Sequence, residues 1–304
     1  MDDNQRQINL FTEYLQIEKN ASSYTIHFYQ SDLRSFKAFL QREGDLSWEE
    51  VDYPIIRVFL TELYDQQLSR RSVSRKLSSL RSFYRFLERE GHVESNPFLH
   101  VSLPKQENPI PSFLYEEELD KLFHVSNTEE PLGQRNQAIL ELLYATGMRI
   151  SECVSCELSD IDLELGTVLV RGKGRKERYI PFGSFAREAL KHYIYNGRNS
   201  LLQKSGMDTG AIWLNAKGSP LTDRGVRLIL NKMVEKAAMT IHVHPHMLRH
   251  TFATHMLNEG ADLRSVQELL GHEHLTSTQI YTHVTKDHLK NVYMNSHPRA
   301  GKDE

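Results

Sequence analysis

A proline-rich segment interrupts the sequence after its first third. Three prolines fall within the eight residues from Pro104 to Pro111. Proline lacks a backbone N–H and its ring clashes with the preceding helical turn, so a continuous helix cannot pass through this segment. We therefore predict an interdomain linker at residues 106–112, between a domain at residues 1–105 and a second domain at residues 113–304.

The composition indicates a globular protein outside the membrane. Apolar residues make up 39% of the chain and charged residues 25%, which is typical of soluble domains. No apolar run approaches the roughly 20 residues that a membrane helix needs. The first residues, Met1 to Gln5, have neither the basic end nor the apolar stretch of a signal peptide. We expect a cytoplasmic protein without membrane insertion.

The two cysteines, Cys153 and Cys156, form one C-x-x-C pair. Such a pair is compatible with a redox couple or with half of a zinc site, but the second pair of ligands that structural zinc requires is missing. We interpret both as ordinary reduced helix residues, because a buried free cysteine behaves as a small hydrophobe. No metal and no cofactor is expected.

The net charge of −3 hides two basic clusters. Residues 66–89 contain seven basic residues against one acid, a net charge of +6, and residues 171–178 reach +4. Clusters of this density suit contacts with phosphate groups, although each is also compatible with a solvated surface. The candidate DNA contacts within them are Arg70, Arg71, Arg75, Arg81 and Arg175.

The first domain shows apolar residues at helical spacing, which predicts a small helical bundle. The spacing is seen at Leu10, Tyr14 and Ile17, and again at Tyr29, Leu33, Phe36 and Leu40. A last long helix is expected from about Ser72 to Gly91, with its apolar stripe at Val73, Leu77, Leu80, Tyr84 and Leu87. Arginines flank that stripe, an arrangement that fits a helix lying in a DNA groove.

The second domain begins with a helix expected from Arg135 to Tyr144 that ends at Thr146-Gly147. Another helix is predicted to start near Met148, with Arg149 in its first turn. Because helix N-termini favour anions over cations, an arginine there is expected to serve a bound anion.

A β-hairpin is predicted next, with strands at residues 167–171 and 177–181 and Lys173 between two glycines in the connection. Glycines let the backbone approach a large ligand, although a polar hairpin tip is an equally simple interpretation. A further strand is possible at Ala211 to Leu214, and Thr222 is the expected N-cap of a helix that reaches about Ala238. The fold class is therefore mainly α, with a small antiparallel sheet.

Titratable residues concentrate between His242 and His283. Pro245 suits a first helical position, so His246 and Arg249 share one face near a positive helix end. After Gly260, a helix through Leu263, Val266, Leu269 and Leu270 leads to His272, and Tyr281 follows nine residues later. Any one of these residues is more often a packing or surface residue than a catalytic one.

The ordered set resembles the tyrosine recombinase (phage integrase) family. Its motifs are Thr146-Gly147-Met148-Arg149, the lysine hairpin, H-x-x-R at His246 and Arg249, L-G-H ending at His272, and Tyr281. The segments 68–73 and 77–81 are similar to the core-binding helix of bacterial Xer recombinases, so the resemblance spans nearly the whole chain. Residues 262–272 and 281–284 look most like the XerC type, which includes CodV.

The resemblance implies a metal-free and ATP-free transesterification. Arg149 and Arg249 would stabilise the phosphorane, since guanidinium groups stay charged and grip phosphate oxygens in a bidentate way. His246 and His272 would add hydrogen bonds, with His246 in acid/base work, and Lys173 would protonate the departing 5′ oxygen. Tyr281 would be the nucleophile, its phenolate favoured by neighbouring positive charge, and would form a 3′-phosphotyrosyl link.

The resemblance also implies partners. A XerC-type protein is expected to act on a double-stranded dif-type site at the replication terminus, within a heterotetramer with a XerD-type recombinase, and to resolve chromosome dimers under a septal DNA translocase. It would then be nucleoid-associated. The C-terminal helix, around Asp287 to Met294, would dock on a neighbouring protomer through Leu289, Val292 and Tyr293, or else pack on its own domain.

Two other classes of protein account for part of the sequence. A metal-dependent phosphohydrolase would rest on His242, His244, His246 and His250, but no acid stands at ligand spacing beside them and no H-E-x-x-H is present. A DNA-binding regulator that lost the chemistry would show gaps among the six candidate residues, and all six are present. A topoisomerase of related chemistry is closer, but the Xer-like first domain favours site-specific exchange.

Overall fold

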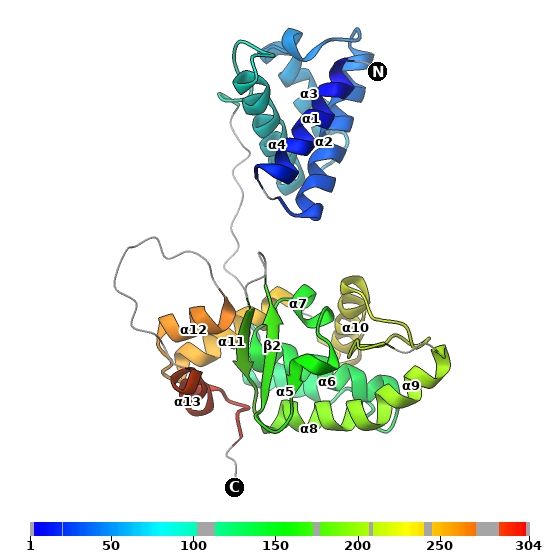
Figure 1. The fold of residues 1–304 in the computed structure, drawn as a ribbon, viewed down its shortest axis with the longest axis vertical. Helices are drawn as coiled ribbons and strands as arrows, with labels where there is room; N and C mark the ends of the chain where they lie inside the picture. Colours follow the sequence, from blue (N-terminus) through cyan, green and yellow to red (C-terminus); the bar gives the residue numbers. More distant parts are fainter. Residues whose placement is uncertain are drawn as a thin grey trace. The chain divides into compact units, whose positions relative to one another are not determined.

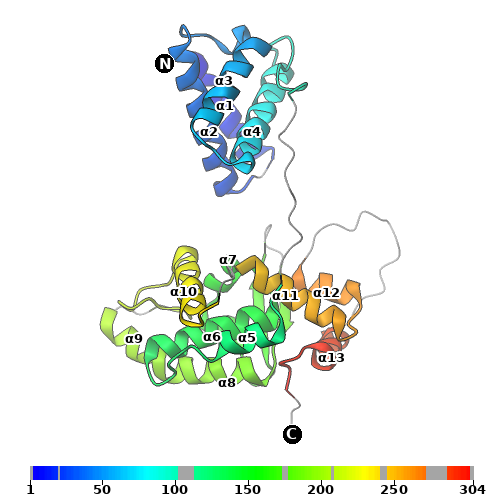
Figure 2. The same cartoon turned by 180° about the vertical axis from the view of Figure 1, so that it is seen from behind.

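The computed structural model describes residues 3–19, 21–101, 113–172, 177–206, 209–239, 245–271 and 286–301. The chain divides into two units, Met1–Asn108 and Pro109–Glu304 (Figures 1 and 2). In the described residues both units are mainly helical, and the second also holds one small sheet. This agrees with the fold class predicted from the sequence. No helix in these ranges is both long enough and apolar enough to cross a membrane.

The first unit is a helical bundle whose helices start at capping side chains. Ser22, Asp52 and Ser69 each accept a hydrogen bond from the backbone N–H three residues later, which satisfies a donor that the helix itself leaves open. The described elements are α1 (Asp3–Ile17), α2 (Ser23–Arg42), the 3-10 turn η1 (Trp48–Glu50), α3 (Tyr53–Asp65) and α4 (Arg70–Arg89).

Aromatic rings fill the core of this bundle. Trp48 packs edge-to-face on Phe83 at a ring-centroid distance of 5.1 Å, and the Tyr84 hydroxyl donates to the Trp48 carbonyl oxygen at 3.1 Å. The predicted stripe of α4 is confirmed, because all five of its apolar residues are buried. The helix predicted from Leu10, Tyr14 and Ile17 is confirmed as α1, but Leu10 and Ile17 are exposed, and the apolar residues that it buries are Ile8, Phe11 and Leu15.

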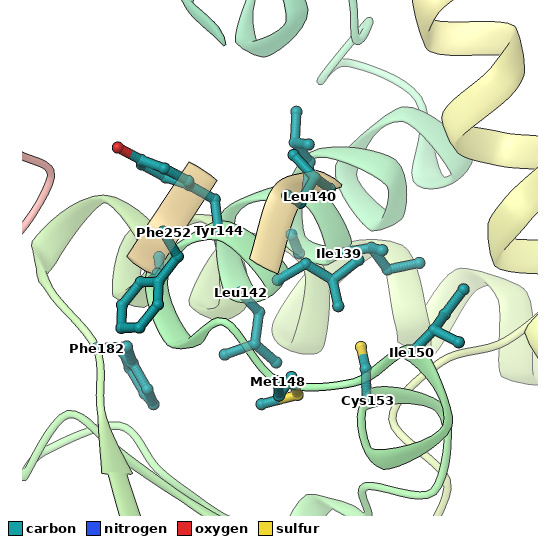
Figure 3. Packing of buried hydrophobic residues seen from close by; sticks show 14 of the residues in the cluster. Ile139, Leu140, Leu142, Tyr144, Met148, Ile150, Cys153, Phe182 and Phe252 are labelled. Atoms are coloured by element: carbon teal, nitrogen blue, oxygen red, sulfur yellow. The ribbon is translucent and has the colours of Figure 1, made fainter. Parts of the chain in front are cut away.

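The second unit is built around α6 (Pro131–Thr146), which is buried on nearly every side. α6 packs against α8 (Ser184–His192) and α11 (Pro245–Asn258). Its residues Ile139, Leu142 and Tyr144 lie in one cluster with Met148 and Phe252 (Figure 3). The other described helical elements of this unit are α5 (Glu116–Phe123), α7 (Ile150–Val154), the 3-10 turn η2 (Leu158–Asp160), the π-helical turn η4 (Tyr193–Gly197), α9 (Arg198–Ser205), α10 (Asp223–Lys236), α12 (Leu263–Leu270) and α13 (Lys286–Ser296).

The sheet is antiparallel, in the order β1 (Ile161–Asp162), β2 (Thr167–Arg171) and β3 (Glu177–Pro181). The predicted hairpin is confirmed, with Thr167 opposite Pro181 and Arg171 opposite Glu177. β2 contacts α7, whereas β3 contacts α12 and α13, so the hairpin lies between two sets of helices (Figure 1). The strand predicted at Ala211–Leu214 was wrong, since its ends form only isolated bridges to Glu157 and Pro220.

Candidate active site

The turn between α6 and α7 depends on a glycine. Gly147 has a φ of +57°, and a Cβ at this position would lie 2.5 Å from Phe252 Cδ1 and 2.8 Å from Leu270 Cδ2. A left-handed conformation and so close an approach together require glycine. The Thr146-Gly147 helix end predicted from the sequence is thereby confirmed, and α11 and α12 pack directly against the turn that leads to Arg149.

Arg249 ties this turn to two helices. From α11, its Nη1 donates to the Gly147 carbonyl oxygen and its Nη2 to the Leu270 carbonyl oxygen, both at 2.7 Å. The side chain is buried, and this burial, together with the nearby Arg149, lowers its pKa to about 10. A guanidinium with that pKa is still cationic at neutral pH, so Arg249 contributes a fixed positive charge.

Arg149 is the N-cap of α7, which begins at Ile150, two residues beyond the predicted start. Its backbone N–H donates to Glu152 Oε2 at 2.8 Å, and its Nη1 donates to Glu152 Oε1 at 2.9 Å. A glutamate at the third helical position closes the helix start in the manner of a capping box. The anion beside Arg149 in the described residues is therefore Glu152. The arginine side chain is still 42% exposed and open to a further ligand.

Glu152 receives a second arginine from the sheet. Arg178 of β3 donates from Nη2 to Glu152 Oε2 at 3.0 Å and from Nη1 to Oε1 at 3.2 Å. Burial alone would raise the pKa of Glu152, but the hydrogen bonds from Arg178 and Arg149 outweigh it, and the pKa is lowered. Three guanidinium groups thus gather around one ionised carboxylate, which leaves a net positive charge where a phosphate can bind.

His246 stands one helical turn before Arg249 on α11, which begins at Pro245 as predicted. His246 is exposed to solvent, whereas the Arg249 side chain is buried inside the unit. His250 is half-buried beside the Phe113 ring, at a centroid distance of 6.4 Å. Four candidates lie outside the described residues: Lys173, Arg175, His272 and Tyr281.

The structure also adds two residues that the sequence reasoning missed. Glu152 was not singled out, although a glutamate three positions after Arg149 is the signal of a capping box. Arg178 was counted only within a basic cluster, although it turns inward to Glu152. Glu152 is the carboxylate around which Arg149, Arg178 and Arg249 lie. Counting charges along the sequence cannot distinguish Glu152 and Arg178 from the other charged residues near them.

The candidate DNA contacts of the first unit are not equivalent. Arg70 and Arg71 are exposed at the start of α4. Arg75 pairs with the buried carboxylate of Asp32 and lies over the Phe28 ring at 4.9 Å. Arg81 donates to two backbone carbonyls, those of Phe98 at 3.2 Å and Val101 at 2.8 Å. Of these four arginines, Arg70 and Arg71 are exposed, whereas Arg75 and Arg81 are half-buried and bonded within the unit.

Cys153 and Cys156 are free and buried. Burial raises the pKa of Cys156 to about 12 and that of Cys153 well above its ordinary value, so neither thiol is a ready nucleophile at neutral pH. Within the described ranges, no group of three or more histidine, cysteine or acidic side chains is placed to hold a metal ion.

The C-terminal helix packs on its own unit in this structure. Tyr293 of α13 is fully buried, and its hydroxyl accepts a hydrogen bond from the Gly183 backbone N–H at 3.1 Å. Leu289 and Val292 are partly buried against the same core. Packing within one chain is thus the arrangement seen for all three candidate docking residues.

Family models match both parts of the sequence. The model described as "Phage integrase family" matches residues 112–288, and the one described as "Phage integrase, N-terminal SAM-like domain" matches residues 8–91. The chain belongs to the phage integrase family. It is a tyrosine recombinase, an enzyme of the class that breaks and rejoins DNA, as the ordered motifs indicated.

Curated relatives resemble the chain over almost its full length. The protein named "Tyrosine recombinase XerC" of Oceanobacillus iheyensis is 64% identical over 96% of this chain and 96% of its own. Its namesake in Bacillus subtilis is 59% identical over 97% of each chain. These likenesses support the XerC type inferred from residues 262–272.

Solved structures share the fold. The XerH site-specific recombinase, in a post-cleavage complex with a palindromic difH substrate, is 26% identical, with a TM-score of 0.67 over 91% of this chain and 81% of its own. A lambda integrase dimer bound to a COC′ core site has a TM-score of 0.68 over 99% of this chain and 79% of its own, at 18% identity. The latter supports the fold alone.

Proposed function

We propose that the chain is a site-specific recombinase that cleaves and rejoins DNA through a 3′-phosphotyrosyl bond to Tyr281. The observation that carries the proposal is the arginine cluster of Arg149, Arg178 and Arg249 around Glu152, in a chain that belongs to the tyrosine recombinases. A phosphorane gains negative charge as it forms, and fixed cations around it lower the barrier without a metal ion.

Each candidate residue has a defined task in this proposal. The exposed guanidinium of Arg149 binds the scissile phosphate, while Arg249 adds charge from a position fixed by the Gly147 and Leu270 carbonyls. His246, exposed one turn earlier on α11, moves a proton at the nucleophile. Lys173 and His272, which lie outside the described residues, act as the acid for the 5′ oxygen and as a further hydrogen-bond donor.

The covalent step balances without a cofactor. The Tyr281 phenolic oxygen bonds to phosphorus, the bond from phosphorus to the 5′ oxygen breaks, and that oxygen takes a proton from Lys173. The phosphoester is retained as a 3′-phosphotyrosine, so a second DNA 5′ hydroxyl can reverse the step. Neither ATP nor a divalent metal is required for this exchange.

The printed names of the relatives support a proposal for the DNA site and the partners. XerH was solved on a difH substrate, and the curated relatives carry the name XerC. We therefore propose a dif-type site, a XerD-type recombinase as partner in a heterotetramer, and chromosome dimer resolution during cell division under a septal translocase. The protein would act in the cytoplasm on the nucleoid. Arg70, Arg71, Arg75, Arg81 and Arg175 are the proposed DNA contacts.

The proposal is tested with a nicked duplex that carries a dif-type site, in EDTA and with a XerD-type partner whose own tyrosine is replaced by phenylalanine. A nick close to the scissile phosphate lets the short product diffuse away, so the covalent complex accumulates. Wild type should give a protein–DNA band on a denaturing gel, Tyr281→Phe none, and Tyr195→Phe a wild-type band, because Tyr195 is exposed on η4. A complex that persists in Tyr281→Phe, or one that needs added metal, would refute the proposal.

A further inference from the structure

Arg178 uses all three of its guanidinium nitrogens inside the protein. Nε donates to the Leu269 carbonyl oxygen at 3.0 Å, and the two Nη atoms donate to the two carboxylate oxygens of Glu152. The side chain is 17% exposed, compared with 42% for Arg149. A Cβ on Gly271 would lie 3.0 Å from the guanidinium carbon, so the end of α12 also closes on it. Arg178 therefore points into the protein rather than toward a ligand.

These contacts link three segments that carry candidate catalytic residues. Arg178 stands in β3, and the connection from β2 to β3 contains Lys173. Its partner Glu152, on α7, contacts Arg149 at the N-cap of the same helix. Its other partner, Leu269, lies three residues before His272 in the sequence. Arg178 thus donates both to Glu152, which holds Arg149, and to the Leu269 carbonyl oxygen near the end of α12.

We propose that Arg178 is a positioning residue for strand cleavage, one that fixes Arg149 through Glu152 and fixes the β3 hairpin against the end of α12. The inference rests on the proposed function, because the reaction it supports is cleavage by Tyr281. Arg178 acts through its neighbours and does not contact the reacting phosphate. Misplacing a catalytic group by about 1 Å can lower the rate roughly 100-fold, so loss of a positioning residue should measurably slow cleavage.

Only arginine can make this set of contacts. Its planar fork bonds both oxygens of one carboxylate while Nε bonds a carbonyl oxygen at a different angle. Lysine at the same position has a single ammonium group, which keeps the charge near Glu152 but cannot reach all three acceptors at once. Arg178→Lys and Arg178→Gln therefore separate the effect of geometry from the effect of charge.

The ionisation of Glu152 gives a readout specific to this role. The groups that face its carboxylate are Arg149 at the N-cap of α7, Arg178 on β3, Arg249 on α11 and the Cys156 thiol after α7. The hydrogen bonds from Arg178 do most to lower the Glu152 pKa against the effect of burial. Without Arg178 the pKa of Glu152 rises, and a protonated Glu152 no longer holds the Arg149 guanidinium.

The experiment measures single-turnover formation of the covalent complex on the nicked dif-type duplex, from about pH 6 to about pH 9. The proteins are wild type, Arg178→Gln, Arg178→Lys and the control Arg264→Gln. Arg264 lies on α12 with a half-exposed side chain and pairs only loosely with Glu268, at 3.9 Å. DNA affinity and thermal unfolding are measured for each protein, so that rates are compared between folded proteins bound to DNA.

We expect Arg178→Gln to form the complex about 10- to 100-fold more slowly near pH 7, with DNA affinity within about twofold of wild type. The deficit should be larger at the acidic end of this range than at the basic end, because loss of the Arg178 hydrogen bonds raises the pKa of Glu152. Arg178→Lys should be slower than wild type but keep its pH dependence, and Arg264→Gln should match wild type. A wild-type rate in both Arg178 variants, or the same loss at every pH in Arg178→Gln, would overturn this inference alone. A wild type that forms no complex would overturn the proposed function and this inference with it.

Discussion

The Arg249 guanidinium donates to the carbonyl oxygen of Gly147 at 2.7 Å, across 102 positions of sequence. This bond joins α11 to the turn that ends α6, and the second bond, to the Leu270 carbonyl, joins both to α12. Arg249, which we propose stabilises the reacting phosphate, therefore also connects α11, the α6–α7 turn and α12 by hydrogen bonds. Loss of the Arg249 side chain should lower both the free energy of unfolding and the rate of DNA cleavage.

Substitution of Arg249 by lysine tests this double role. The ammonium group keeps a positive charge but cannot bond both carbonyl oxygens, so one buried acceptor loses its partner at a cost of about 1–3 kcal/mol. We expect the free energy of unfolding to fall by that amount in urea titrations, and single-turnover cleavage to fall at least about 100-fold. An equal rate in Arg249→Lys and wild type would show that the bidentate geometry is irrelevant to the reaction.

The arginines of α4 should divide into two kinds. Arg71 is exposed, so Arg71→Ala should weaken DNA binding at all sequences and reduce the slope of log affinity against log salt by about 1. Arg81 caps the carbonyls of Phe98 and Val101, both of which are buried residues. Arg81→Ala should lower the free energy of unfolding by about 1–3 kcal/mol. Fluorescence anisotropy over a salt series, alongside urea unfolding, distinguishes the two. A stability loss in Arg71→Ala with none in Arg81→Ala would reverse the assignment.

The buried imidazole of His297 should make the protein acid-sensitive. Its Nδ1 accepts a hydrogen bond from the Arg299 backbone N–H at 3.1 Å, and burial lowers its pKa to about 3. The unfolded chain binds the proton near the ordinary pKa of about 6.5, so the stabilising effect is present above that pH and is lost as the pH falls toward 3.

The corresponding measurement is the free energy of unfolding of wild type and His297→Phe between about pH 7 and about pH 5.5. Over this interval wild type should lose about 1 kcal/mol more than the variant, because only wild type takes up this proton on unfolding. His255, whose pKa burial also lowers, contributes in the same direction and is present in both proteins. Parallel curves for the two proteins would mean that His297 does not titrate between the two states.

The sequence predicted elements well where a single pattern dominated. The α4 stripe from Val73 to Leu87 is buried as expected, and the helix starts at Arg70 rather than Ser72 because Ser69 caps it. In α1 two apolar sets share the helix, and tertiary packing buries Phe11 and Leu15 while Ile17 stays exposed. Periodicity alone cannot choose between two such faces.

Other differences arise from long-range contacts. Ile212 and Trp213 are buried and apolar like strand residues, but the segment meets its neighbours only through isolated bridges. The roles of Glu152 and Arg178 depend on contact between α7 and β3, which are 26 residues apart at these positions. Motif spacing identifies Arg149 and Arg249 as candidates, and the spacing of a capping box could have added Glu152, but the contact between Glu152 and Arg178 depends on the fold.

Peptide mapping of the covalent complex determines whether the DNA is bonded to Tyr281. Complete cleavage after Lys and Arg releases residues 265–286 as one peptide, and Tyr281 is its single tyrosine among the 13 of the chain. After nuclease digestion of the complex, mass spectrometry should find the mass of a nucleotide 3′-phosphate on this peptide, with fragment ions that place it on Tyr281. Attachment to any other residue, or through a 5′ phosphate, would show that Tyr281 is not the nucleophile of a 3′-phosphotyrosyl reaction.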